Sequence, residues 1–431
     1  MKQYETYKDS GVEWIGEIPE NWLVSEYKFV SEVQNGFAFK SAMFDKNIGF
    51  PILRIRDITS GEISTFYKGD YTDDYIVQKG DLLIGMDGDF NIRWWDKENV
   101  LLNQRCCKII ENEKSVKRFL YYSLPFNLQI INDLTYYTTV KHLSSGDINN
   151  AKFPLPSLQE QTQIAVYLDY KTSLIDTIIK QKEDLIKKLQ EQRQAIINEA
   201  VTKGLNPDAK LKDSGIKWLG EIPEHWVIPK LKFLTNQIID GAHFTPTYVE
   251  KGVPFLRVTD IQSEKINLDK VKFIPESEHK DLIKRCNPKR GDILLSKNGT
   301  IGITKVIDWD WEFSIFVSLC LIKFNKKLTP RYFSHFFNSS IVDQQIKMSS
   351  KTTSVTNLHL EKIKELLIAI PIDTEEQIAI SDYLDGKLGE YDLILTENEK
   401  SIIKLKEYRQ SLISEAVTGK IDVRDWQLPK S

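Results

Sequence analysis

Long hydrophobic runs are absent from this 431-residue sequence, and their absence excludes a membrane-spanning helix. No apolar stretch approaches the roughly eighteen residues that such a helix requires. The opening residues, MKQYETYKDSG, also lack the apolar core of a secretory signal. We therefore expect a cytoplasmic protein that makes no contact with a membrane.

Cysteine is scarce and irregularly placed. The sequence has four cysteines, Cys106, Cys107, Cys286 and Cys320, with neither C-x-x-C spacing nor a regular framework. Structural zinc sites and disulfide scaffolds both depend on such spacing. We interpret the four residues as reduced thiols that mostly fill space in the core.

The common catalytic and cofactor motifs are missing as well. The sequence contains no G-x-x-x-x-G-K-[ST] phosphate loop, no N-P-P-[FYW] adenine-methylation motif and no H-E-x-x-H zinc helix. Its six histidines are scattered, so no metal-ligand cluster stands out. We expect a non-catalytic chain that binds no metal or cofactor itself. The alternative, an enzyme whose groups converge from distant positions, stays open.

Positive charge is not in excess. The 58 Lys and Arg residues are outnumbered by 61 Asp and Glu residues, which gives a net charge of −3. Proteins that coat DNA through a broad basic surface have the opposite balance. Any contact with DNA must therefore depend on basic groups that are concentrated locally. The hydrophobic share of 41% is that of a globular protein long enough for two or three domains.

An internal duplication organises the chain. The segment DSGVEWIGEIPENW at residues 9–22 recurs 204 residues later as DSGIKWLGEIPEHW at 213–226, with ten of fourteen positions identical. PILRIRDI (51–58) matches PFLRVTDI (254–261), and GDLLI (80–84) matches GDILL (291–295). Chance would match roughly one position in fifteen. The chain therefore consists of two copies of one ancestral unit.

The ends of the two copies correspond at a larger spacing. EQTQIAVYLD (160–169) matches EQIAISDYLD (376–385), and RQAIINEAVT (193–202) matches RQSLISEAVT (409–418), both 216 residues apart. The second copy has therefore gained twelve residues (216 − 204) between opening and closing motifs that stayed nearly fixed. One part of the repeat is constrained, and the other part is free to vary.

Each copy has a β-rich part followed by a helical part. Short apolar runs with Gly, Pro, aromatic and β-branched residues indicate mixed β-rich domains at 1–156 and 205–371. Proline-free segments with helical periodicity follow at 157–204 and 372–421, and residues 422–431 form a tail. We predict an α+β protein with two β-rich domains, two long helices and a pseudo-twofold internal repeat.

The helical segments carry a coiled-coil seam, in which apolar residues recur every three or four positions. Lys182 and Asn398 fall at the same seam position, where a polar residue fixes register and partner, so we interpret them as register-setting residues. Ile179, Ile186, Leu395 and Ile402 widen the stripe. The predicted seam consists of Leu168, Ile175, Ile178, Lys182, Leu185, Leu189 and Ile196 in the first segment and Leu384, Tyr391, Ile394, Asn398, Leu405 and Leu412 in the second.

The length of these helices favours pairing with each other. About 45 residues in a helix would extend about 65 Å, more than one small domain can cover. The alternative is that each helix packs only on its own domain. Antiparallel pairing of the two similar helices would place the domains at opposite ends of a spacer. Such a spacer would suit DNA half-sites roughly one helical turn, or somewhat more, apart.

The repeated motifs together resemble those of a Type I restriction-modification specificity subunit. The openings W-[IL]-G-E-I-P-E-x-W, P-x-L-R-x-x-D-I and G-D-[LI]-L, the E-Q helix starts and the R-Q-x-[IL]-I-x-E-A-V-T ends occur twice, in the family's order. The resemblance implies two target-recognition domains, each reading half of a bipartite double-stranded DNA site. It also implies docking of two methyltransferase subunits, which carry S-adenosylmethionine and methylate adenine. Motor-nuclease subunits would then join to form the restriction enzyme.

Base readout requires side chains with paired donors and acceptors, such as Arg or Lys for guanine and Asn or Gln for adenine. Polar loops in both β-rich domains supply such residues. The candidates in the first domain are Asn35, Lys40, Ser41, Arg54, Arg56, Asn91, Arg93, Tyr136, Tyr137, Thr138, Thr139, Lys141 and His142. Those in the second domain are His243, Thr245, Arg257, Lys297, Asn298, Thr300, Lys351, Thr352, Thr353 and Asn357.

Structural roles compete with DNA contact at several of these positions. Arg54 and Arg257 lie inside apparent strands, where they would be either base contacts or half-buried structural cations. Arg93 has no visible counterpart in the second copy. The threonine pairs beginning at Thr138 and Thr352 could bind phosphate or cap a turn, and we favour DNA contact. The repeated tryptophans, Trp14, Trp22, Trp218 and Trp226, are more typical of packing than of base stacking.

Two other functions are compatible with the sequence. One is a specificity subunit that serves a related Type II system with a fused nuclease and methyltransferase. The other is a coiled-coil scaffold that assembles proteins and does not contact DNA. In a scaffold, substitution of Arg93 or Lys297 would leave the function of the complex unchanged.

Overall fold

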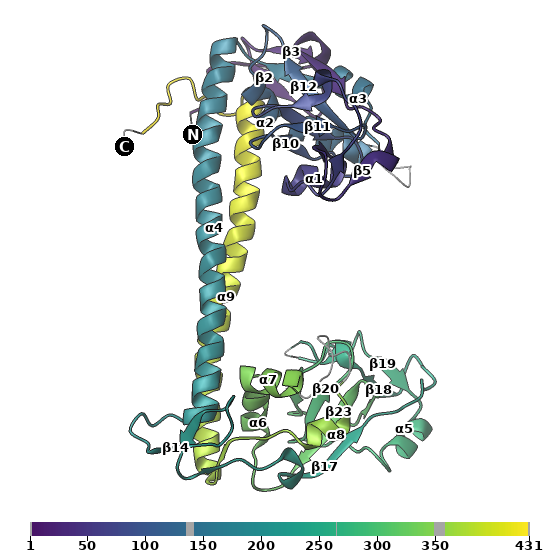
Figure 1. Ribbon diagram of the computed structural model, residues 1–431, viewed down its shortest axis with the longest axis vertical. Helices are drawn as coiled ribbons and strands as arrows, with labels where there is room; N and C mark the ends of the chain where they lie inside the picture. Colours follow the sequence, from purple (N-terminus) through teal and green to yellow (C-terminus); the bar gives the residue numbers. More distant parts are fainter. Residues whose placement is uncertain (1, 135–141, 264, 349–357, 430–431) are drawn as a thin grey trace. The chain divides into compact units, whose positions relative to one another are not determined.

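The computed structural model describes residues 2–134, 142–263, 265–348 and 358–429. The chain forms two compact units, which we call unit 1 (residues 1–182 and 400–431) and unit 2 (residues 183–399). Each unit combines one β-rich domain with one end of each of the two long helices, α4 (Leu158–Lys203) and α9 (Thr374–Val417) (Figure 1). Two β-rich domains and two long helices confirm the predicted fold class.

Unit 1 is built on short strands. A four-stranded antiparallel sheet has the order β10-β9-β12-β4, and a five-stranded sheet beside it has the order β5-β7-β6-β11-β8. Two-stranded pairs, β1-β2 and β13-β3, complete the unit. The strands are β1 (Tyr7–Asp9), β2 (Glu17–Pro19), β3 (Leu23–Glu26), β4 (Ser31–Asn35), β5 (Phe44–Asp45), β6 (Phe50–Leu53), β7 (Phe66–Tyr67), β8 (Ile76–Val77), β9 (Leu82–Gly85), β10 (Ile92–Trp94), β11 (Val100–Leu102), β12 (Cys106–Glu111) and β13 (Lys152–Leu155).

Unit 2 repeats this plan. Its four-stranded sheet has the order β17-β23-β20-β21, which matches β4-β12-β9-β10, and its three-stranded sheet has the order β19-β18-β22. The pairs β14-β15 and β16-β24 correspond to β1-β2 and β3-β13. The strands are β14 (Leu211–Asp213), β15 (Glu221–Pro223), β16 (Trp226–Val227), β17 (Thr235–Asp240), β18 (Val253–Leu256), β19 (Lys272–Ile274), β20 (Ile293–Ser296), β21 (Thr304–Val306), β22 (Ser314–Ile315), β23 (Leu319–Phe324) and β24 (Ile370–Pro371).

The shorter helices also correspond between the units. Helix α2 (Lys117–Leu134) contains Pro125, and its place in unit 2 is taken by two consecutive helices, α6 (Pro330–Phe337) and α7 (Ser340–Met348). Proline has no backbone N–H to donate, so α2 lacks one helical hydrogen bond at Pro125 although the helix continues through it, whereas unit 2 breaks into two helices at the corresponding point. The remaining short helices are α1 (Ile55–Ser60), α3 (Ser145–Asn150), α5 (Glu276–Leu282), α8 (Leu360–Lys364) and the 3₁₀ turns η1 (Tyr27–Phe29), η2 (Ser41–Met43), η3 (Asp73–Tyr75), η4 (Leu231–Phe233) and η5 (Val258–Asp260).

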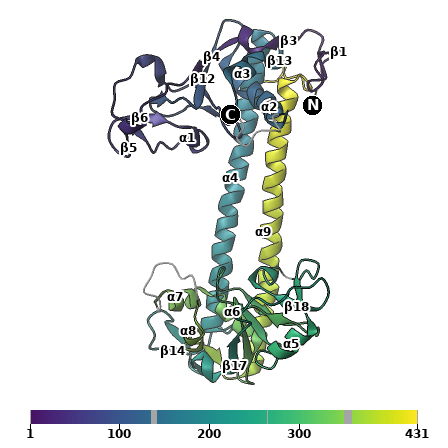
Figure 2. The same cartoon turned by 90° about the vertical axis from the view of Figure 1, so that its right-hand side faces the viewer.

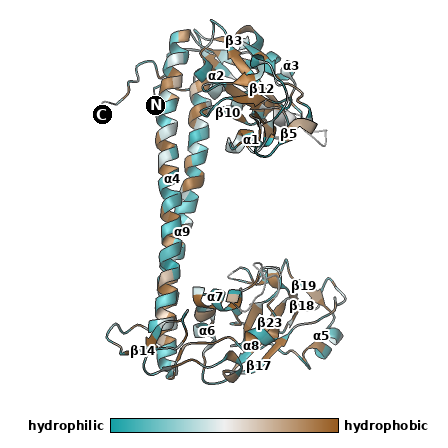
Figure 3. Cartoon of the chain, in the orientation of Figure 1, coloured by the Kyte–Doolittle hydropathy of each residue, from teal (hydrophilic) through white to brown (hydrophobic). Residues whose placement is uncertain are grey.

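The core of each unit lies on the central sheet strands, as the apolar colouring of β12 and β23 indicates (Figure 3). Leu82 and Ile84 of β9 are fully buried, as are their counterparts Ile293 and Leu295 of β20.

All four cysteines are unpaired and buried, as predicted. Burial raises the pKa of the Cys106 thiol to about 12. No helix in the described ranges is long and apolar enough to cross a bilayer.

Both long helices begin and end with recognisable signals. The Ser157 hydroxyl accepts the Glu160 backbone N–H at 3.3 Å, and Asp373 accepts the N–H of Glu375 at 2.9 Å. Such N-caps satisfy backbone donors that the first turn of a helix leaves free. Gly204 and Gly419 follow the helix ends with φ of 73° and 76°, a conformation that favours glycine. Each helix therefore ends near a glycine, and the two glycines lie within one residue of equivalent positions in the repeat.

Within each unit the ends of α4 and α9 pack antiparallel. In unit 1 the end of α9 reaches the start of α4, because Gly419 lies against Trp22 and the Trp22 indole donates to Glu160 (Figure 2). In unit 2 the end of α4 reaches the start of α9 in the same way, through Gly204, Trp226 and Glu376. Direct contacts between the two helices, Arg409 with Asp176 in unit 1 and Arg193 with Asp392 in unit 2, agree with the predicted coiled coil.

The seam differs in part from the prediction. Ile178 and Ile394 are 41% and 46% exposed, whereas Ile179 is buried at 8% and Leu395 is half-buried. Leu185, also predicted, is 42% exposed, while its neighbour Ile186 is half-buried. The prediction placed these three residues one position too early, because it continued a three-residue step where the packed helix takes four. The seam positions with side chains turned inward are Leu168, Thr172, Ile175, Ile179, Lys182, Ile186, Leu189, Arg193 and Ile196, with Leu384, Leu388, Tyr391, Leu395, Asn398, Ile402, Leu405, Arg409 and Leu412 in α9.

Candidate DNA-binding surfaces

Loops from separate strands meet at one edge of the four-stranded sheet in unit 1. The loop after β4 packs so closely on the loop after β11 that a Cβ on Gly36 would lie 2.2 Å from the Asn103 carbonyl oxygen. Only glycine fits this approach. The Met86 N–H donates to the Arg105 carbonyl, and the Leu143 N–H donates to the Met86 carbonyl. Backbone hydrogen bonds therefore hold four loops together at this edge.

Polar side chains converge on this edge, which we call edge 1 and define by Asn35, Asp87, Arg105, His142 and Ser145. His142 Nδ1 lies 2.7 Å from Asp87 Oδ1, and Arg105 Nε lies 3.6 Å from Asp87 Oδ2. The Ser145 hydroxyl donates to Asn35 Oδ1 at 2.7 Å. The histidine and arginine side chains are 51% and 53% exposed. A carboxylate thus orients two exposed side chains that are able to reach an external ligand.

Unit 2 assembles the corresponding edge from the same loops. A Cβ on Gly241 would lie 2.1 Å from the Ile315 carbonyl oxygen, and Lys297 donates its N–H to the Ser318 carbonyl. The Leu358 N–H donates to the Lys297 carbonyl at 2.8 Å, as Leu143 does to Met86 in unit 1. The backbone frame of the edge is therefore common to both copies.

The polar groups on this frame differ in unit 2. We define edge 2 by Asp240, His243, Lys297, Asn298 and Thr300. Asp240 lies 3.2 Å from Lys297 Nζ and 3.4 Å from His243 Nε2. The His243 side chain is 57% exposed, and Asn298 keeps a buried Oδ1 without a hydrogen-bond partner among the described residues. Each edge therefore pairs an aspartate with an exposed histidine, but it presents a different set of donors.

Lys297 does not have the exposure expected of a base-contacting residue. Its side chain is only 7% exposed, and that of its partner Asp240 is 9% exposed. The sequence suggested an exposed loop because Lys297 precedes Asn298 and Gly299. The polypeptide instead turns inward, since the Lys297 backbone makes two hydrogen bonds to neighbouring loops. Lys297 is a buried ion-pair partner that supports edge 2.

Three candidate arginines bind the protein itself. Arg54 and Arg257 do not lie inside strands as expected, because β6 and β18 end one residue earlier and a helical turn begins. Their backbone N–H groups donate to Asp57 and Asp260 at 2.9 and 2.8 Å. Arg56 donates to the hydroxyls of Ser64 and Thr65. The side chains of Arg56 and Arg257 therefore have local polar partners, Arg257 through its ion pair with Asp260. The Arg54 guanidinium instead lies 5.8 Å from the centre of the Phe44 ring.

Arg93 has a structural counterpart that sequence comparison missed. Its guanidinium donates to the Ile58 and Thr59 carbonyls at 3.1 Å, and the side chain is 20% exposed. Lys305 occupies the equivalent position on β21 and donates to the carbonyl of Ser263 at 3.1 Å. The shared contact indicates that this cation holds the turn after β6 or β18. The prediction that Arg93 has no counterpart was wrong.

The other candidates divide into exposed residues and residues outside the described ranges. Lys40, Ser41, Asn91 and Thr245 are exposed in loops or turns of their domains. Their contact with DNA stays a prediction. The candidates outside the described residues are Tyr136, Tyr137, Thr138, Thr139, Lys141, Lys351, Thr352, Thr353 and Asn357.

The residues of the two edges that sequence reasoning missed are Asp87, Arg105, Ser145 and Asp240. Asp87 follows the apolar run LLIGM directly, so its place just beyond a strand end was a usable signal. The prediction that the repeated tryptophans pack in the core holds for some of them only. Trp22 and Trp226 are fully buried, as predicted, but Trp14 is 47% exposed. Across the described ranges, no cluster of three His, Cys, Asp or Glu side chains is arranged to hold a metal ion.

The geometry of both edges suits direct reading of base edges. Arginine offers paired donors to guanine, asparagine pairs with adenine, and a carboxylate accepts from the cytosine amino group. Edge 1 has all three residue types within one set of loops. Each edge places an aspartate beside its basic side chains, so neither edge by itself is the local concentration of basic groups that the composition led us to expect.

Comparison with known proteins identifies the family of the chain. The family model described as the Type I restriction modification DNA specificity domain matches the chain at residues 19–188 and 242–405. The chain is 33% identical over 417 residues to the Type I restriction enzyme EcoBI specificity subunit of Escherichia coli, covering 94% of this chain and 87% of that protein. It is 26% identical to the MjaVIII specificity subunit of Methanocaldococcus jannaschii, with 95% of each chain covered.

Solved structures share the fold. A chain from a study of complex assembly and conformational transition in the type I R-M system superposes with a TM-score of 0.71 at 19% identity, covering 94% of this chain and 99% of that one. The HsdS subunit from Thermoanaerobacter tengcongensis superposes with a TM-score of 0.51 at 17% identity, covering 94% and 98%. These matches do not favour a Type II subunit or a scaffold without DNA contact. Two matched domains, carried on a duplicated frame, show that the chain belongs to the DNA specificity subunits of Type I restriction-modification enzymes.

Proposed function

We propose that this chain recognises a bipartite, gapped sequence in double-stranded DNA, and that each edge reads one half-site. The observation that carries the proposal is the common loop frame of the two edges, which presents different side chains in each unit. Edge 1 offers Asn35, Arg105 and His142, whereas edge 2 offers His243 and Asn298. A shared frame supports a shared task, and different donors support different target bases.

The long helices would fix the gap between the half-sites. Helix α4 has 46 residues without proline, and it pairs with α9 in both units. A paired helix is stiffer than a flexible linker, so its length would limit which half-site separations fit. We expect a separation of roughly one DNA turn or somewhat more.

The same helices would dock the partner subunits, and the chain itself would be non-catalytic. Leu174, Ile178 and Leu185 expose more than 40% of their surface along α4, and Leu393 and Ile403 expose 71% and 56% along α9. Exposed apolar side chains in a row typically mark a protein interface. We propose two methyltransferase subunits as the partners. They would supply S-adenosylmethionine and methylate adenine, and motor-nuclease subunits would join them.

A reconstituted complex tests this function. The chain would be mixed with its methyltransferase subunits, S-adenosylmethionine and a pool of random-sequence duplexes, and the methylated products would be sequenced. We expect one motif with two defined halves and a fixed gap. The chain without the methyltransferase, and the methyltransferase without the chain, should give no methylation. Methylation that occurs without any sequence preference would contradict the proposal.

A further inference from the structure

An aromatic side chain after α9 covers a tyrosine of α4 in unit 1. Trp426 packs edge-on against Tyr167, with ring centroids 5.1 Å apart, and it also contacts Tyr170 at 5.5 Å. The Gln163 side chain donates to the Trp426 carbonyl at 2.5 Å. As a result Tyr167 is only 5% exposed. We call this place the tryptophan seat of unit 1.

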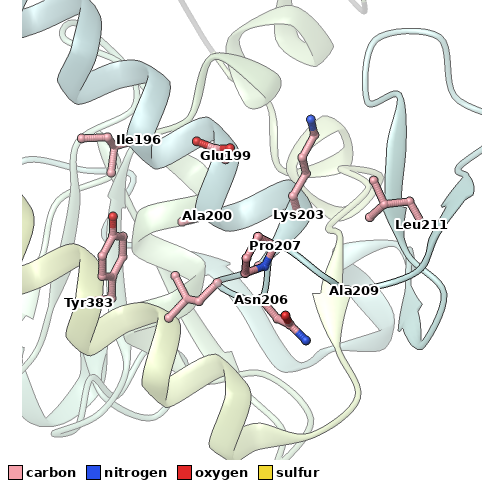
Figure 4. A pocket seen from close by; sticks show the side chains of 11 residues that line it. Ile196, Glu199, Ala200, Lys203, Asn206, Pro207, Ala209, Leu211 and Tyr383 are labelled. Carbon is pink, nitrogen blue, oxygen red and sulfur yellow. The ribbon is translucent and has the colours of Figure 1, made fainter.

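Within the described part of the chain, no aromatic ring covers the equivalent seat in unit 2. Tyr383 is the counterpart of Tyr167 in the repeat, 216 residues later, and it is 40% exposed. Beside it lies a cavity of about 560 Å³ between the end of α4 and the start of α9 (Figure 4). Its walls include Ile196, Leu205 and Pro207. The same helix surface is therefore covered in one unit and open in the other.

Chain connectivity explains the difference. After α4 the chain continues through residues 205–210, which contain no aromatic residue, into β14. The Glu224 N–H donates to the Lys210 carbonyl at 2.8 Å and fixes this connection. Leu205 and Leu211 of the connection remain 42% and 37% exposed. The connection after α4 therefore brings no aromatic ring to Tyr383, whereas the segment after α9 brings Trp426 to Tyr167.

The open seat has smaller side chains at two positions that hold Trp426 in unit 1. Gly386 replaces Tyr170, and an added Cβ there would meet no atom within 4 Å. Ala379 replaces Gln163, so the side-chain donor that holds the Trp426 carbonyl is also missing. The walls keep apolar side chains, and Glu199 and Lys203 line the cavity beside them. This combination suits a large aromatic ring with a polar edge, because such rings bury much apolar area at an interface.

We propose that this cavity binds an aromatic side chain from an extended segment of a methyltransferase subunit, an inference that rests on the proposed function. The filled seat shows which chemistry fits this helix surface. A second copy of this chain is a poor source, because its own Trp426 segment is already held. The Asp422 N–H donates to the Lys2 carbonyl at 2.9 Å, and Ile421 and Val423 are each 4% exposed. An outside subunit therefore supplies the ring.

Affinity for the methyltransferase subunit tests the inference with the full-length chain. Tyr383→Ala removes one wall, and Leu205→Trp fills the cavity from within, so each should weaken binding about tenfold or more. Tyr71→Ala is the control, since Tyr71 is 38% exposed in unit 1, far along the sequence from the seat, and should leave the affinity unchanged. Circular dichroism would check that each variant is folded. Full affinity in both folded seat variants would overturn the inference, while failure of the unmodified chain to bind would overturn the proposed function as well.

Cross-linking identifies the source of the ring. The four native cysteines are buried, so Lys203→Cys provides one reactive thiol at the cavity for a benzophenone-maleimide probe. In the assembled complex we expect a cross-link to an aromatic-containing segment of the methyltransferase subunit. A cross-link to a second copy of this chain, or none to the methyltransferase in an intact complex, would overturn the assignment.

Discussion

Arg409 of α9 donates two hydrogen bonds to Asp176 of α4, from Nε to Oδ1 at 2.9 Å and from Nη2 to Oδ2 at 3.2 Å. Their counterparts 216 residues away, Arg193 and Asp392, form the same pair in unit 2 with Nε 3.2 Å from Oδ1. Each arginine lies in the last third of one helix and each aspartate in the first half of the other. The internal repeat therefore places one charged contact twice and sets antiparallel register in both units.

The Arg409–Asp176 pair should contribute modestly to stability and strongly to register. The two side chains are 30% and 53% exposed, so Arg409→Ala should lower the free energy of unfolding by roughly 0.2–1 kcal/mol. Arg409→Asp should cost more because it places two carboxylates together. The exchanged pair, Asp176→Arg with Arg409→Asp, should recover most of the loss in urea unfolding. Equal destabilisation by the exchanged pair and the single reversal would contradict this account.

The buried Lys297–Asp240 pair should be sensitive to loss of one partner. Lys297→Met removes the buried cation beside Asp240 and leaves only the exposed His243 next to that carboxylate, which should lower the free energy of unfolding by roughly 3–5 kcal/mol. The double variant Lys297→Met with Asp240→Asn should lose less, because no buried charge remains. Urea unfolding of both variants measures the difference. A double variant less stable than Lys297→Met would show that the charge imbalance is not the cause.

Glu160 and Glu376 should have matching roles at the starts of the long helices. Glu160 accepts from the Trp22 indole at 3.2 Å, and Glu376 accepts from the Trp226 indole at 3.1 Å. Glu160→Ala leaves a buried indole N–H without its acceptor, so we expect a loss of roughly 1–3 kcal/mol of unfolding free energy. Glu376→Ala is the matched variant and should lose a similar amount. Glu160→Gln, which keeps an acceptor oxygen, should lose less than either.

Stability should fall in mildly acidic solution because of His335. Burial lowers the pKa of this histidine below its ordinary value of 6.5, and the adjacent Asp385 carboxylate offsets only part of that effect. The unfolded chain therefore binds the proton more readily than the folded chain. The contribution is fully present above about pH 6.5 and is lost as pH falls through the lower folded pKa. His335→Gln should flatten this part of a stability–pH profile, and an unchanged slope would contradict the assignment.

Duplication and helix periodicity made the architecture predictable. The repeated motifs mark equivalent elements, so a role inferred for a residue in one copy can be checked at its counterpart in the other. Trp22 and Trp226, for example, are both fully buried in the cores of their units. Seam register was less predictable, because Ile178 and Ile179 are both apolar and only packing decides which turns inward. Helix boundaries after β6 and β18 were missed because PILRIRDI is apolar at strand spacing, while Asp57 caps a helical turn within it.

The candidate edges were less predictable than the fold. Their members come from loops distant in sequence, such as Asp87 and His142, and only the folded backbone brings them together. Exposure was a second difficulty, since Lys297 and Arg93 have the composition of DNA-contacting residues but are held by internal partners. Local sequence carries the residue type, whereas tertiary contacts decide whether a side chain is available.

The central claim is that each edge reads its own half-site. Single-molecule sequencing of adenine methylation, in cells that carry the chain and its methyltransferase, tests this claim with one variant at each edge. Arg105 and His243 are 53% and 57% exposed, and loss of a base contact typically costs about 1–3 kcal/mol of discrimination. Arg105→Ala should relax only one half of the methylated motif, and His243→Ala only the other half. Relaxation of both halves by either variant, or no defined motif from an intact wild-type complex, would contradict the account.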